Sequence, residues 1–118
     1  MNSKEIYMLV ENFFGYKIKM LYLNSETNEV GGIMYDSFLI KCLCDNKKDS
    51  FQLGIYYGNS TLVLTKLLGE NCSCKIDEKK IKKKLQVVDD YCRLRLPDKF
   101  LDAYYKAYVL SQYEDCDM

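Results

Sequence analysis

The spacing of apolar residues changes along the chain, and each change marks an expected element. Ser3 is a good helix N-cap, and apolar residues recur behind it at helical spacing: Ile6, Leu9, Val10 and Phe13. Gly15 follows where a helix favours a left-handed C-terminal residue. From there every second residue is apolar, as in a half-buried strand: Tyr16, Ile18, Met20 and Tyr22. The pattern predicts an N-terminal helix followed by a strand.

Alternation of apolar and polar residues predicts three further strand regions, at 30–44, 51–57 and 61–68. We expect the first of these to break near Asp36 and to bulge at Gly31-Gly32. Gly58-Asn59-Ser60 predicts a hairpin turn before the last strand. That last strand is apolar on both sides, so we expect it to lie centrally in the sheet.

The C-terminal part of the chain has helical periodicity. Asp77 is expected to cap a helix whose apolar stripe docks on the sheet: Ile81, Leu85, Val88 and Cys92. Pro97 separates it from a last helix with an apolar face formed by Phe100, Ala103, Tyr104, Ala107 and Tyr108. The order predicts an α+β fold with an N-terminal helix, about four antiparallel strands in a curved sheet and two C-terminal helices. We expect one domain over 1–118, with a flexible acidic tail at 111–118.

Composition narrows the classes of function. The 118 residues are 48% hydrophobic and 29% charged, which is ordinary for a globular domain and excludes a disordered chain. Seventeen basic side chains balance seventeen acidic ones, so net charge indicates neither a nucleic-acid nor a membrane partner. The absence of histidine excludes Ser-His and Cys-His catalysis and imidazole metal sites. Since no Gly-rich phosphate loop or nucleophile elbow is present either, we expect no catalytic residue, no cofactor and no enzymatic activity.

The N-terminal segment carries no pattern typical of export. Its uncharged run, Ile6 to Val10, is too short for the apolar region of a signal peptide. The longest apolar stretches also fall far short of the roughly 20 residues that a bilayer-spanning helix needs. We therefore expect a cytoplasmic protein.

Six cysteines include a repeated Cys-x-Cys pattern, Cys42/Cys44 and Cys72/Cys74. Four thiolates can hold a structural zinc ion, although zinc motifs usually place at least two residues between paired cysteines. A disulfide between the two pairs requires an oxidising compartment. In a cytoplasmic chain, free thiols without a metal are the favoured interpretation, and the other two states stay open.

A cluster of lysines precedes and enters the first C-terminal helix. Its side chains could bind phosphates, and we name Lys79, Lys80, Lys82 and Lys83 as the alternative anion-binding residues. Ile81 and Leu85 interrupt the cluster at helical spacing, so a solvated helix face explains it more simply.

Eleven tyrosines and no tryptophan suit a protein-binding surface, because a tyrosine ring is large and rigid and has a polar end. Five tyrosines fall on the apolar faces described above and are predicted to be core: Tyr16, Tyr22, Tyr57, Tyr104 and Tyr108. Four others are candidates for a contact surface: Tyr35, Tyr56, Tyr105 and Tyr113. Asp89 and Asp90 diverge by about 100° on a helix and cannot share a proton, so we assign them to capping and solubility.

The hairpin FQLGIYYGNSTLVLTKLL (51–68) and the closing helix LPDKFLDAYYKAY (96–108) resemble small immunity proteins of bacterial polymorphic toxin systems, including contact-dependent growth inhibition. The resemblance covers the general layout of the chain, and no functional residue is transferred from it. It implies a non-enzymatic inhibitor that binds and neutralises one cognate toxin domain, a nuclease in many such systems.

For such an inhibitor we expect partner-binding residues among exposed tyrosines and the acidic tail: Tyr56, Tyr105, Tyr113, Glu114, Asp115 and Asp117. The alternative is a phosphate- or nucleic-acid-binding accessory protein, or an anti-defence protein, of a phage or mobile element. The oligomeric state is left open.

Overall fold

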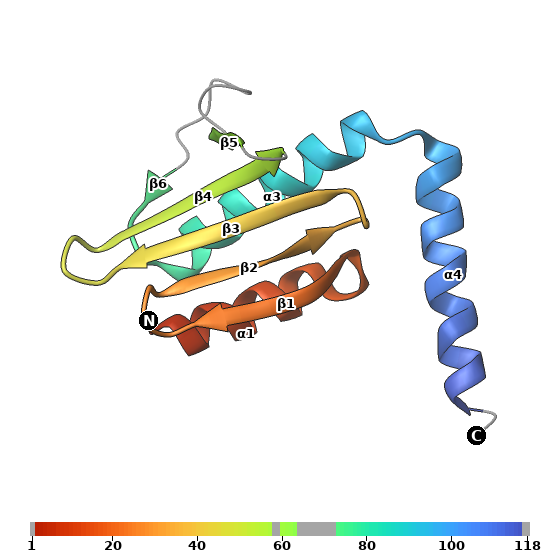
Figure 1. The fold of residues 1–118 in the computed structure, drawn as a ribbon, viewed down its shortest axis with the longest axis horizontal. Coiled ribbons are helices and arrows are strands. Elements are labelled where there is room, and N and C mark those ends of the chain that lie inside the picture. Colours follow the sequence, from red (N-terminus) through yellow and green to blue (C-terminus); the bar gives the residue numbers. More distant parts are fainter. Residues whose placement is uncertain (1, 58–59, 64–72, 117–118) are drawn as a thin grey trace.

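A computed structural model describes residues 2–57, 60–63 and 73–116, with backbone alone described at 56–57, 60–63, 73 and 113–116. The chain begins with α1 (Ser3–Phe14) and the short 3-10 helix η1 (Gly15–Lys17). Six strands follow: β1 (Ile18–Asn24), β2 (Glu29–Met34), β3 (Phe38–Asp45), β4 (Ser50–Tyr57), β5 (Ser60–Val63) and β6 (Ser73–Cys74). Two helices, α3 (Glu78–Arg95) and α4 (Asp98–Cys116), complete the described chain. The predicted α+β class and order of elements are confirmed (Figure 1).

The strands form one antiparallel sheet in the order β1-β2-β3-β4-β5, with β6 also paired to β4. The predicted break near Asp36 is confirmed, because the 30–44 region forms the two strands β2 and β3. β5 lies at the end of the strand order, so the prediction of a central fourth strand is wrong for its described part. Residues 58–59 of the predicted turn and 64–68 of that strand lie outside the described residues.

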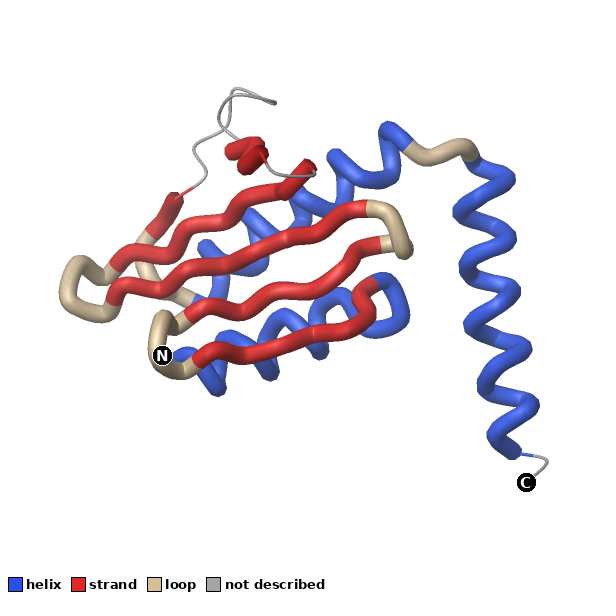
Figure 2. The backbone as a smooth tube through the Cα atoms, viewed as in Figure 1, coloured by secondary structure: helices blue, strands red, loops and turns tan. Residues whose placement is uncertain are grey.

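Helices α1 and α3 lie against one face of the sheet (Figure 2). Alternate residues of β3, Phe38, Ile40, Cys42 and Cys44, are buried on that face. The predicted stripe of α3, Ile81, Leu85, Val88 and Cys92, is entirely buried, and the rings of Phe38 and Tyr91 lie 6.2 Å apart between sheet and helix. These side chains belong to one hydrophobic core.

Local capping fixes where the helices begin. Asn2, rather than Ser3, caps α1: its side chain accepts a hydrogen bond from the Glu5 amide while the Glu5 carboxylate accepts one from the Asn2 amide. Gly15 ends α1 as its position predicted and has a positive φ of 56°, but its ψ of −125° lies outside the left-handed helical conformation. The Asp77 side chain accepts from the Lys80 amide and caps α3, which confirms that prediction.

The predicted bulge at Gly31-Gly32 is wrong in its placement. Both glycines pair regularly with β3, and the irregularity lies between Lys19 and Tyr22 of the neighbouring strand β1. A Cβ atom on Gly31 would lie 2.6 Å from the Tyr22 hydroxyl oxygen, so the missing side chain makes room for that ring.

Helix α4 stands to one side of the sheet and of the other two helices (Figure 1). The radius of gyration is 15.0 Å, whereas a compact chain of this length is expected near about 13.5 Å. Among the described α4 side chains Tyr104 alone is buried. Within the described ranges no helix combines the length and apolar character needed to cross a bilayer. α4 extends through Cys116, so residues 111–116 of the predicted tail belong to a helix. The flexibility of the 111–118 tail stays a prediction.

Candidate functional site

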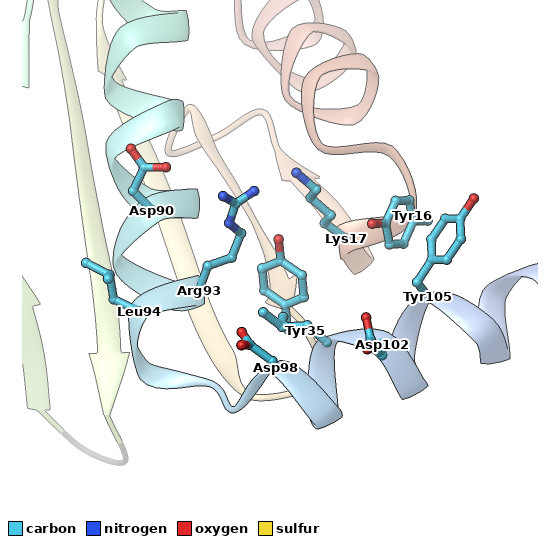
Figure 3. Close-up of a pocket in the computed structure, with 10 residues that line it drawn as sticks. Tyr16, Lys17, Tyr35, Asp90, Arg93, Leu94, Asp98, Asp102 and Tyr105 are labelled. Carbon is cyan, nitrogen blue, oxygen red and sulfur yellow. The ribbon is translucent and has the colours of Figure 1, made fainter.

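A cleft of about 730 Å³ lies where α3, α4 and η1 meet, and we call it the α3–α4 cleft. Its lining residues are Tyr16, Lys17, Tyr35, Asp90, Arg93, Leu94, Asp98, Leu101, Asp102 and Tyr105. Tyr16 and Tyr105 stand together at one end of the cleft, and Asp98 and Asp102 follow α4 (Figure 3). A volume of this size is typical of ligand sites in proteins.

Beside this cleft lies a buried polar network centred on Asp89, which is 2% exposed. Lys17 donates a hydrogen bond from Nζ to Oδ2 of Asp89 at 2.9 Å, and the Tyr35 hydroxyl donates to Oδ1 at 2.5 Å. Arg93 contributes a second, more distant cation 3.9 Å from Oδ2. Both carboxylate oxygens are therefore occupied by partners from the chain itself.

Two sequence interpretations fail at this network. Tyr35, a predicted contact-surface residue, is 2% exposed, and Asp89, assigned to capping and solubility, is buried. Tyr35 is turned inward by the tight β2–β3 turn, where its φ is 52°. Asp89 lies about 80° around α3 from Ile81, only about 40° beyond the edge of the apolar stripe at 100° per residue. That angle was the available signal for a buried carboxylate.

Burial and nearby negative charge raise the pKa values of two tyrosines here. Desolvation first, then the hydrogen bond and charge of Asp89, raise the pKa of Tyr35 far above its ordinary range. Burial, with smaller contributions from Asp36 and Tyr16, raises the pKa of Tyr104 to about 12. Both hydroxyls therefore stay protonated and act as donors at neutral pH.

Four tyrosines attach α4 to η1, and we call them the tyrosine cluster: Tyr16, Tyr104, Tyr105 and Tyr108. The Tyr104 hydroxyl donates to the Tyr16 carbonyl oxygen at 3.0 Å. The Tyr16 ring stacks on Tyr108 at 4.9 Å between centroids and meets Tyr105 edge-on at 5.5 Å. The rings of Tyr105 and Tyr108 are thus held in place although both side chains are exposed.

The core predictions for tyrosines are met in part. Tyr104 is buried, Tyr16 and Tyr22 are half-buried, and the Tyr57 side chain is not described. Tyr108 is 40% exposed, so its assignment to the core is wrong. The reason is that α4 leaves the core after its first turns, which periodicity along the helix does not report.

The α4 side of the cleft carries uncompensated negative charge. Asp98 and Asp102 are exposed, lie one turn apart on α4, and form no ion pair with any described residue. Asp90, on α3, is also exposed and accepts a hydrogen bond from Gln86. Arg93 is the one exposed cation in the lining, while Lys17 is half-buried; their side chains lie 3.9 Å and 2.9 Å from Oδ2 of the buried Asp89.

Of the predicted partner-binding residues, Tyr105 lines the cleft and is 51% exposed. Tyr56 lies in β4, where its backbone pairs with Leu39 and Thr61, on an element separate from α4 (Figure 1). Three others belong to the last turn of α4 and their side chains are not described: Tyr113, Glu114 and Asp115. Asp117 lies outside the described residues. The binding roles of all six stay predictions.

The alternative anion-binding residues all lie exposed on the first half of α3: Lys79, Lys80, Lys82 and Lys83. Lys82 pairs with Glu78 one turn earlier at 3.2 Å. The buried Ile81 lies among them and the buried Leu85 follows one turn later, as a solvated helix face predicts.

The described cysteines, Cys42, Cys44, Cys74 and Cys92, are free. Cys44 and Cys74 pair with opposite sides of Phe51, so their Cα atoms lie about 10 Å apart, too far for a disulfide. Among the described residues no three acidic, cysteine or histidine side chains gather as metal ligands. Burial raises the pKa of the Cys44 thiol to about 11 and that of Cys92 to about 12. Cys72 lies outside the described residues.

Comparison of the chain with protein-family models, curated proteins and solved structures found no match. A function must therefore be argued from the surface and the cleft.

Proposed function

We propose that the chain is a non-enzymatic protein-binding inhibitor, an immunity protein that binds and neutralises a cognate toxin domain, such as a nuclease, in the bacterial cytoplasm. The observation that carries this proposal is the exposed apolar surface of α4. On one side of this helix, which projects from the body of the protein, Tyr105 is 51% exposed and Tyr108 is 40% exposed; Leu110, on another side of the helix, is 62% exposed. Leu94, near the end of α3, lines the α3–α4 cleft and is 79% exposed.

The chemistry of this surface suits a protein partner. Exposed tyrosines bury a large area on binding and lose little side-chain entropy, and the packing of Tyr105 and Tyr108 on Tyr16 reduces that loss further. Apolar and aromatic side chains at the centre of an interface carry most of its binding free energy. A projecting helix can also enter a groove on the partner.

The polar groups of the cleft support a binding role over catalysis. Lys17 and Tyr35 occupy both carboxylate oxygens of Asp89, so this buried carboxylate is not positioned to take a proton from a substrate. The raised pKa of Tyr35 opposes its action as a base near neutral pH.

The test is co-expression of the chain with a panel of nuclease toxin domains, scored by cell survival and by co-purification. The proposal predicts protection against one domain and a complex of one to one stoichiometry. It predicts that Tyr105→Ala combined with Tyr108→Ala, which removes the two exposed rings on one side of α4, abolishes protection. Met8 and Leu43, exposed apolar residues of α1 and β3, provide the matched control as Met8→Ala with Leu43→Ala. Protection that is equally lost in the control, or found with no domain, contradicts the proposal.

A second candidate function rests on the exposed lysines of α3. Lys79, Lys80 and Lys83 form no ion pair with a described residue, so their ammonium groups could meet phosphates of a nucleic acid. Affinity for DNA or RNA would then fall linearly with salt on a logarithmic plot, and alanine at these positions would reduce the slope. Fluorescence anisotropy with a labelled oligonucleotide at low salt tests whether the chain binds nucleic acid. If no binding is seen at low salt, the nucleic-acid-binding function is excluded.

A further inference from the structure

We propose that the α3–α4 cleft receives an arginine side chain of the protein partner, between the carboxylates of Asp98 and Asp102 and the ring of Tyr105. This inference rests on the proposed function, because it assigns the chemistry of the partner's contacting group. It follows from the charge, the aromatic wall and the size of the cleft.

The charge of the cleft calls for a cation. Its exposed groups are three carboxylates, Asp90, Asp98 and Asp102, against the single guanidinium of Arg93. Asp98 stands in the first turn of α4, where the helix dipole stabilises an acidic side chain. Asp102 lies beyond that turn and four residues from a like charge, an arrangement that destabilises a helix. An incoming cation would relieve this repulsion.

The ring of Tyr105 in the lining favours arginine over lysine as the bound side chain. Asp98, Asp102 and Tyr105 follow one another at helical spacing along α4, so two carboxylates and one ring border the same space (Figure 3). A guanidinium group is planar, binds carboxylate oxygens through two parallel hydrogen bonds and stacks on aromatic rings. The chain already contains this contact, because the Arg95 guanidinium carbon lies 3.5 Å from the centre of the Tyr91 ring.

The size of the cleft permits a side chain together with part of its backbone. Its volume, about 730 Å³, far exceeds what one guanidinium group fills, so a loop or helix end of the partner can enter with it. Arg93 lies across the cleft from Asp102 and disfavours a second cation deep inside (Figure 3). The geometry therefore points to one arginine rather than a polybasic segment.

The experiment is an NMR titration of the full chain with the peptide acetyl-Gly-Gly-Arg-Gly-Gly-amide at low salt, followed through backbone amide shifts. We expect saturable shifts confined to residues that line the α3–α4 cleft, largest at 98–105, and at least fivefold weaker binding of the same peptide with lysine. Asp98→Asn with Asp102→Asn should weaken arginine-peptide binding at least tenfold. Glu11→Gln with Glu26→Gln, which neutralises two exposed carboxylates elsewhere, should leave it unchanged.

Equal binding of the two peptides, shifts spread over acidic residues outside the cleft, or equal effects of the two double variants would overturn the inference. Measuring the affinity of the chain for a partner toxin domain distinguishes failure of the arginine inference from failure of the proposed function. If a complex forms but Asp98→Asn with Asp102→Asn changes its Kd less than twofold, the arginine inference fails and the function stands. If the peptide titration behaves as expected and no toxin domain binds, the proposed function fails.

Discussion

The Tyr35 hydroxyl donates a hydrogen bond to Oδ1 of Asp89, a residue 54 positions later in the sequence. This bond joins the β2–β3 turn to α3. The Tyr35 amide also donates to the Lys17 carbonyl oxygen at 2.8 Å, and the Lys17 side chain completes the network on the same carboxylate. One buried carboxylate thus fixes η1, a turn and a helix relative to each other, and these segments contribute to the walls of the α3–α4 cleft.

The first prediction concerns the pair Lys17–Asp89. Removing Lys17 leaves the buried Asp89 carboxylate with only the more distant Arg93 as a cation, so Lys17→Met should lower the free energy of unfolding by about 3 kcal/mol. Asp89→Leu should also destabilise the protein. In the double variant the loss of free energy of unfolding should be clearly smaller than the sum of the losses in the two single variants. Chemical denaturation measures all three values. Additive losses would show that the pair makes no coupled contribution.

The second prediction concerns Gly31. A Cβ atom there would lie 2.7 Å from the Ile40 carbonyl oxygen, an atom of the backbone that cannot move without disturbing the sheet. We expect Gly31→Ala to lower the free energy of unfolding by about 1–3 kcal/mol in thermal or chemical denaturation. A variant as stable as the wild type would contradict the close approach of β2, β3 and the Tyr22 ring.

The third prediction concerns Met20 in the β1 irregularity. Its φ is 55° although its side chain is 78% exposed, so the left-handed backbone costs energy that no packing returns. Met20→Gly should therefore raise the free energy of unfolding by about 0.5–1 kcal/mol. Met20→Ala is the control, because it removes the side chain without relieving the backbone. An equal gain in both variants would assign the effect to the side chain instead.

The fourth prediction concerns alkaline pH. Burial raises the pKa of Cys92 from 9.0 to about 12, so the folded chain keeps a proton that the unfolded chain loses above pH 9. The free energy of unfolding should hence fall as pH rises from 9 towards 12, by up to about 1.4 kcal/mol per pH unit for this group. Cys44, with a pKa of about 11, acts in the same direction.

Denaturation curves at pH 8, 9 and 10 under reducing conditions measure this decline. Cys92→Ala lowers stability at every pH by removing packed atoms, but it should make the decline between pH 9 and 10 shallower. An unchanged decline would show that the Cys92 thiol does not titrate as its burial requires.

Much of the fold could be predicted because local patterns and tertiary packing agree. The stripe of Ile81, Leu85 and Val88, the cap Asp77 and the stop at Pro97 all lie where the sequence placed them. The position of β5 could not be predicted, since apolar residues on both faces of a strand do not reveal which neighbours cover it.

The candidate site was harder to predict from the sequence than the fold. Tyr105 was among the predicted contact residues, and its place on the rim of the cleft is known from the structure. Asp98 and Asp102 carry no distinguishing signal in the sequence, because their isolation from cations depends on how α3 and α4 meet. Tyr35 was misassigned because a turn residue with positive φ directs its side chain independently of strand alternation.

The most direct test of the account is calorimetric titration of the chain with the toxin domain from which it protects cells. We predict one-to-one binding, and for Tyr105→Ala a Kd raised at least about 30-fold, equivalent to about 2 kcal/mol, in a variant whose circular dichroism shows the helix content of the wild type. Equal affinities of wild type and variant would contradict the account, as would a chain that binds no toxin domain at all.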